Sequence, residues 1–183
     1  MTPPAARLPR VVVLGCGNPS RGDDALGPLL MARVADWIEA HPDRPVTAVE
    51  DFQLQVEHTL DLQGSDLVLF VDATASGHEA VALHAVRPAA DFSFSTHALS
   101  PSALLNAYMT LARGTPPPSF TLTMRGYSFG LGQPLSPRAA QSLESAWSRL
   151  QLLLENPSRL SWEASCAPET APRHFAHHAA ETR

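Results

Sequence analysis

Five consecutive apolar residues, Leu67-Val68-Leu69-Phe70-Val71, stand between two aspartates, Asp66 and Asp72. A strand made only of apolar residues is typical of a parallel sheet that helices cover on both faces. The run therefore predicts a central strand of such a sheet. Asp72 then lies at the carboxyl end of this strand, where ligand sites of open α/β sheets form.

Other segments repeat the alternation of strand and helix. Apolar runs predict further strands, and apolar residues at helical spacing predict helices between them. The predicted strands are residues 11–14, 46–49, 120–124 and 81–86, and the predicted helices are 26–38, 54–62, 101–113 and one beginning at Pro137. Residues 81–86 follow a short Gly77-containing turn, so we expect them to run antiparallel to their neighbour. The pattern predicts a three-layer α/β/α sandwich: a mostly parallel, twisted five-stranded sheet with one antiparallel strand and helices on both faces.

The chain is long enough for one domain. It has 183 residues, of which 44% are hydrophobic. We expect an N-terminal tail over residues 1–9 and a single domain over residues 10–155. Periodicity disappears from Pro157 onward, so residues 156–183 are expected to form a flexible tail.

Charge and composition exclude several classes of partner. The net charge is −5, which leaves no basic surplus for binding nucleic acid. No apolar run reaches the roughly 20 residues that a transmembrane helix needs. Two cysteines make no disulfide framework, and the first residues lack the apolar stretch of a secretion signal. We expect a cytoplasmic monomer that binds neither nucleic acid nor a membrane.

Polar residues follow several predicted strands. Asp23 and Asp24 come after the first strand, Asp51 follows the second, Asp72 ends the third, and His97 follows the fourth. Carboxyl ends of parallel strands meet at one edge of a sheet, so these side chains are expected to converge there. Asp24, Asp72 and His97 together make a candidate site for a divalent transition metal, with coordination positions left open.

Each of these three residues also has an ordinary structural explanation. Asp24 can cap the first helix through its side chain. Asp72 can favour a turn at the end of its strand. A histidine near a helix start, such as His97, is often a surface or capping residue.

Two other motifs are incomplete. Gly15-Cys16-Gly17 follows a strand as in dinucleotide-binding folds, but Ser20 replaces the third glycine, and the two aspartates that follow would repel a pyrophosphate. Residues 126–130 match G-x-S-x-G around Ser128, but no helix follows directly, as a nucleophile elbow requires.

Cys16 at a strand end is more simply explained by packing than by nucleophilic catalysis.

A series of motifs resembles the hydrogenase maturation peptidases over about residues 10–154. The first block is the most specific, and the others occur in family order. In chain order, the motifs are Val13-Leu14-Gly15-Cys16-Gly17-Asn18-Pro19, Arg21-Gly22-Asp23-Asp24-Ala25-Leu26-Gly27-Pro28, Phe70-Val71-Asp72-Ala73, Thr96-His97-Ala98-Leu99-Ser100-Pro101, Ser128-Phe129-Gly130-Leu131-Gly132 and Leu135-Ser136-Pro137. A further stretch, residues 51–58, resembles the "QL…E" segment of one subgroup and hints at which precursor is recognised.

The resemblance implies a phosphorylase/hydrolase-like fold. It also implies an endopeptidase, a hydrolase that removes the C-terminal extension of a nickel–iron hydrogenase large-subunit precursor after nickel insertion. It places the nickel-contacting residues of the family on Asp24, Asp72 and His97, which are also the catalytic candidates. No permanently bound cofactor is implied, because the substrate supplies the nickel, for which another divalent metal can substitute. Asp23 or Asp51 is a weaker candidate for a base or an orienting group.

Two alternatives stay open. A non-catalytic chaperone of the large subunit would use the same acidic edge to sense the metal without cutting. A small-molecule hydrolase or phosphorylase on a similar sheet would need cationic contacts for an anionic substrate, and Arg21 is the one positive residue in the first loop.

Overall fold

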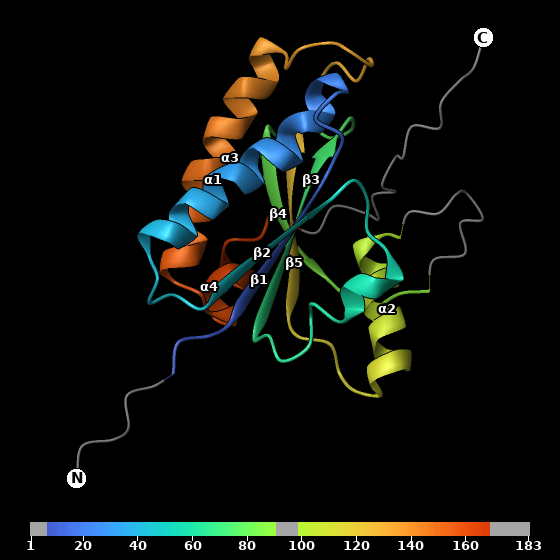
Figure 1. The fold of residues 1–183 in the computed structure, drawn as a ribbon, viewed down its shortest axis with the longest axis vertical. Coiled ribbons are helices and arrows are strands. Elements are labelled where there is room, and N and C mark those ends of the chain that lie inside the picture. Colours follow the sequence, from blue (N-terminus) through green and yellow to red (C-terminus); the bar gives the residue numbers. More distant parts are fainter. Residues whose placement is uncertain (1–6, 91–98, 169–183) are drawn as a thin grey trace.

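The computed structural model describes residues 7–90 and 99–168, in which five strands form one sheet in the order β2-β1-β3-β5-β4 (Figure 1). The strands are β1 (Val11–Cys16), β2 (Val46–Asp51), β3 (Leu67–Thr74), β4 (Val81–Val86) and β5 (Ser119–Arg125). β1, β2, β3 and β5 run parallel, and β4 pairs antiparallel with β5. The predicted mostly parallel sheet with one antiparallel strand is confirmed.

The two faces of the sheet carry separate apolar clusters. On β1, Val11 and Val13 join the cluster of α1 (Leu26–Ala40) and α3 (Pro137–Glu155), while Val12 and Leu14 face the cluster of α2 (Pro101–Ala112). Successive side chains of a strand point to opposite faces, so an all-apolar strand feeds both clusters. Figure 1 shows α1 and α3 on one side and α2 on the other. The predicted three-layer sandwich is therefore confirmed.

Two helices begin at the predicted Ser-Pro pairs. The Ser100 hydroxyl accepts a hydrogen bond from the Ala103 N–H at 3.1 Å, and the Ser136 hydroxyl accepts one from Ala139 at 3.2 Å. A proline follows each serine at the first helical position, where its missing N–H costs nothing. The starts of α2 and α3 are thus determined locally.

β4 is antiparallel as predicted, but it lies beside β5 rather than beside β3, which precedes it in the chain. β5 is buried along most of its length and occupies the slot next to β3. β4 has more exposed positions, which suits the edge of the sheet.

Residues 54–62 were expected to form a helix, and the structure gives only a short 3-10 helix, η2 (Val56–Thr59). Leu54 and Leu62 are buried, whereas Val56 and Leu60 are 44% and 67% exposed. The apolar side chains of this segment therefore do not share one face. A longer helix would have no continuous apolar face to pack against the core.

A last helix, α4 (Arg159–Ala164), follows the point where we expected the domain to end, at residue 155. Its Trp162 is fully buried, stacks edge-on against Phe120 at 5.2 Å between ring centroids, and donates from Nε1 to the Leu153 carbonyl at 3.0 Å. The packed structure therefore extends past residue 155. Among the helices of the described residues, none has the length and apolarity to cross a membrane.

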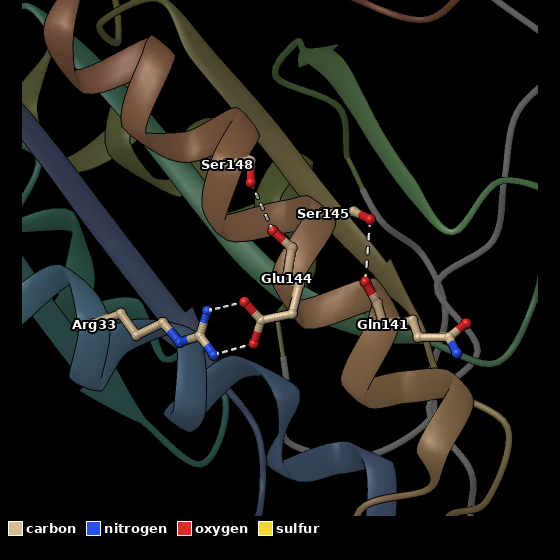
Figure 2. A network of polar contacts seen from close by, with 5 residues as sticks. All are labelled: Arg33, Gln141, Glu144, Ser145 and Ser148. Atoms are coloured by element: carbon tan, nitrogen blue, oxygen red, sulfur yellow. Dashed lines mark hydrogen bonds and ion pairs between the residues drawn. The ribbon is translucent and has the colours of Figure 1, made fainter.

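Arg33 and Glu144 join α1 to α3 on the outer face of the helix layer (Figure 2). The guanidinium of Arg33 forms two hydrogen bonds with the Glu144 carboxylate, one of them 3.0 Å long. Ser148 lies one turn after Glu144 in α3, and its hydroxyl donates to the Glu144 backbone carbonyl. A shallow depression beside this pair is lined by Trp37, His41 and Trp147, on the helix layer rather than at the strand ends.

Candidate functional site

Three carboxylates meet around Cys16 at the carboxyl ends of the parallel strands. Cys16 ends β1 and pairs in register with Asp51 at the end of β2. On the other side of β1, Val71 pairs with Gly15, which places Asp72 beside Cys16. Burial, followed by the charges of Asp72, Asp51 and Asp24, raises the pKa of the Cys16 thiol to about 12. The structure therefore brings Asp24 and Asp72 together at one rim, with Asp51 beside them.

The Asp24 carboxylate acts on Asp72 as a like charge. Burial is the main cause that raises the pKa of Asp72 to about 7, and the Asp24 carboxylate adds to it. A hydrogen bond from the backbone of Ala73 acts in the opposite direction. Two neighbouring carboxylates are stabilised by a proton or a cation between them. A proton or a cation between Asp24 and Asp72 would therefore relieve their repulsion.

Asp24 lies in the 3-10 helix η1 (Gly22–Ala25) that leads into α1. Ala25 occupies the N-cap position of α1, so Asp24 does not cap this helix. Its Oδ2 instead accepts a hydrogen bond from the Asn18 N–H at 3.1 Å. The backbone at Gly17, whose φ is +149°, passes close to the backbone of Asp24. A Cβ at this position would lie 2.2 Å from the Asp24 carbonyl oxygen. The glycine-rich motif therefore serves to orient Asp24.

Asp23 has a structural role that the sequence analysis missed. Its fully buried carboxylate accepts hydrogen bonds from the N–H groups of Tyr127, Ser128 and Ser136, at 2.6, 2.9 and 2.7 Å. The Ser136 hydroxyl donates a fourth at 2.8 Å. Burial alone would raise the pKa of Asp23, but these hydrogen bonds outweigh it and lower the pKa below its usual value. Both oxygens are occupied, so Asp23 holds two loops together and is no free base.

Ser128 is engaged within its own loop. Its hydroxyl donates to Oε1 of Gln133 in the same loop. Its backbone carbonyl accepts a hydrogen bond from the Asp23 N–H at 2.7 Å. The G-x-S-x-G match is thus part of the loop that Asp23 holds, in agreement with the sequence interpretation.

Asp51 is the third carboxylate of the rim. Its Oδ1 accepts from the Phe52 N–H at 2.6 Å, and its Oδ2 lies 3.4 Å from Nε2 of Gln55 and 3.5 Å from Nε2 of His58. His58 was not among the residues selected from the sequence. The three-residue spacing of Gln55 and His58, in which each side chain caps the other's backbone, is the signal that could have identified it.

The predicted third metal ligand, His97, lies outside the described residues. Within residues 7–90 and 99–168, no group of three or more histidine, cysteine, aspartate or glutamate side chains has the geometry to hold a metal ion. The described part of the site therefore supplies two of the three predicted ligands, Asp24 and Asp72.

Comparison with known proteins identifies the fold. No family model matches the chain, and no curated protein matches its sequence. Solved structures do match. The [NiFe] hydrogenase maturation protease HycI from Thermococcus kodakarensis KOD1 superposes with a TM-score of 0.61 at 23% identity, over 80% of this chain and 93% of that one. The hydrogenase maturating endopeptidase HybD from E. coli gives 0.59 at 20% identity, over 81% and 94%.

A further match is the endopeptidase HycI from Escherichia coli, with a TM-score of 0.57 at 21% identity, over 79% of this chain and 90% of that one. All three structures are covered almost completely, so the likeness extends over a whole domain. At these identities the likeness concerns the path of the backbone. The fold of this chain is that of the hydrogenase maturation proteases.

Proposed function

We propose that this chain is an endopeptidase that removes the C-terminal extension of a nickel–iron hydrogenase large-subunit precursor after nickel insertion, and that it recognises the nickel bound in that substrate. The observation that carries the proposal is the pair formed by Asp24 and Asp72 at the carboxyl rim of the sheet. The fold shared with structures described as hydrogenase maturation proteases supports it.

The acidic pair suits a client that brings its own cation. Without a cation the two carboxylates repel each other, and burial disfavours the ionised form of Asp72. A nickel ion between them would remove both penalties, so a loaded precursor would bind more tightly than an empty one. His97 is proposed as the third ligand. We therefore assign Asp24, Asp72 and His97 to nickel recognition.

The same contact would serve hydrolysis. A divalent ion polarises a nearby carbonyl and orients the peptide, and it can lower the pKa of a water molecule. The chain's own contribution is to place the scissile bond at the rim. The Cys16 thiol and the Ser128 hydroxyl are both poorly suited to an acyl-enzyme route, because the thiol has a pKa raised to about 12 and the hydroxyl donates to a glutamine.

The proposal is tested with a purified precursor. The protein is incubated with nickel-loaded and nickel-free large subunit, and the released C-terminal peptide is identified by mass. Cleavage of the loaded form alone supports the proposal. Binding of the loaded form without release of a peptide would instead establish the metal-sensing chaperone.

Substitutions then test the assignment of residues. Asp24→Asn, Asp72→Asn and His97→Ala should each reduce cleavage strongly, while Ser128→Ala serves as the control and should cleave normally. Normal cleavage by all three site variants would reject the assignment.

A further inference from the structure

The carboxylate of Asp51 is held by the segment that follows it. The Phe52 N–H donates to Oδ1 at 2.6 Å, and the side-chain nitrogens of Gln55 and His58 approach Oδ2 to 3.4 and 3.5 Å. A carboxylate that accepts from two sides has a defined orientation. None of these three donors is an arginine, so these contacts orient the Asp51 carboxylate without an ion pair to a permanent cation.

The ring of His58 is itself fixed. The Gln55 N–H donates to Nδ1 at 2.9 Å, so Nδ1 is the acceptor and a neutral ring carries its hydrogen on Nε2. That hydrogen faces Asp51. The His58 residue is only 8% exposed, which prevents the ring from turning away into solvent. Backbone, imidazole and carboxylate thus form a chain of contacts that ends at the rim.

Asp51 lies beside the acidic pair but is held by different contacts. All three carboxylates act on Cys16, whereas burial and then Asp24, but not Asp51, raise the pKa of Asp72. The backbone also fixes Asp51, because the Gly17 N–H donates to its carbonyl at 3.3 Å and joins the ends of β1 and β2. Asp51 thus has its own orienting contacts beside the pair of Asp24 and Asp72. Carboxylates in different environments can take different roles in one reaction, one holding a cation and another accepting a proton.

We propose that Asp51 is the proton acceptor for the water that attacks the scissile peptide bond, and that His58, with Gln55, is a positioning residue for its carboxylate. This rests on the proposed peptidase function. The water oxygen bonds to the carbonyl carbon while its proton passes to Asp51. The carbon–nitrogen bond then breaks, and Asp51 returns the proton to the amine of the departing segment. Hydrolysis is complete without any further reactant.

The first test needs no substrate. The ¹⁵N spectrum of the His58 imidazole in the full chain distinguishes the two neutral tautomers. We expect the Nε2–H form, and we expect its Nε2 resonance to shift in Asp51→Asn while that of His41, on the helix layer, does not. An Nδ1–H tautomer, or a His58 spectrum unchanged by Asp51→Asn, would overturn the positioning role.

The second test is kinetic. Asp51→Asn should lower kcat by about 100-fold or more, the typical contribution of a general base. His58→Ala should lower kcat about 10-fold with little change in KM. His58→Gln should recover part of the loss, because its amide can donate toward Asp51. His41→Gln is the matched control and should behave as wild type, and thermal melting checks that each variant folds.

The outcomes separate the two proposals. If the wild type does not cleave nickel-loaded precursor, the peptidase function is wrong, and the role of Asp51 falls with it. If the wild type cleaves and Asp51→Asn keeps its kcat, the peptidase function stands and the Asp51 role is overturned. A loss in His58→Ala that appears only in KM, or that His58→Gln does not restore, overturns the positioning role of His58.

Discussion

The Asp23 carboxylate receives two hydrogen bonds from Ser136, one from its N–H at 2.7 Å and one from its hydroxyl at 2.8 Å. Ser136 is also the N-cap of α3. One side chain thus joins the loop after β1 to the start of the last long helix. Because Asp24 is the next residue, the position of the candidate site depends on this contact.

Replacement of Asp23 should therefore destabilise the protein. Asp23→Ala leaves several donors without a partner, and we expect a loss of about 2–4 kcal/mol in the free energy of unfolding. Urea denaturation measures it, with Asp36→Asn on the exposed side of α1 as the control. Because the folded state lowers the pKa of Asp23, its contribution is present above the unfolded value and is lost as the pH falls through the folded pKa. A stability equal to wild type at pH 7 would contradict this role.

Asp72 should have the opposite dependence on pH in the metal-free protein. Its folded pKa is about 7, well above the unfolded value, so the folded state holds a proton that the unfolded state has released. Stability is therefore greatest below the unfolded pKa and falls as the pH rises to about 7. Asp72→Asn should raise the melting temperature at pH 8 and change it little at pH 3.5, with an upper bound of about 4 kcal/mol at the higher pH. Equal shifts at both pH values would contradict the raised pKa.

Local signals explain which parts of the fold were predictable. Strands were recognised from runs such as residues 67–71, because an all-apolar strand fits the centre of a covered sheet. The starts of α2 and α3 depend on a serine and a proline that act within one turn. The meeting of Asp24 and Asp72 followed from topology, because carboxyl ends of parallel strands share an edge.

Contacts between distant segments explain what was missed. Asp23 looked like a possible base, and only the position of residues 127–136 reveals that its oxygens are occupied. α4 has six residues, and its Leu160 is 79% exposed, so periodicity could not mark it. Its place depends on Phe120, a residue of β5 that packs against Trp162. Such pairings depend on the assembled sheet and not on a local pattern.

Cys16 should react slowly in the folded protein despite its place at the rim. A pKa raised to about 12 leaves very little thiolate at pH 8, and the thiolate is the reactive form. Iodoacetamide followed by peptide mapping should label Cys16 much more slowly in the native state than in urea. Cys16→Ala should retain cleavage of the precursor. Rapid native labelling together with an inactive Cys16→Ala variant would restore the thiol as a nucleophile.

Trp162 should be essential to the stability of the domain although it lies beyond the last long helix. It is fully buried against Phe120, and its Nε1 donates to the Leu153 carbonyl, so α4 closes one end of the α1–α3 cluster. Trp162→Ala should cost about 3–5 kcal/mol, while Trp162→Phe keeps most of the packing, loses the hydrogen bond and should cost clearly less. Leu160→Ala on the exposed face of the same helix is the matched control and should change stability by under about 0.5 kcal/mol. Thermal unfolding of the three variants decides between a packed helix and a dispensable tail, because a tail predicts no difference among them.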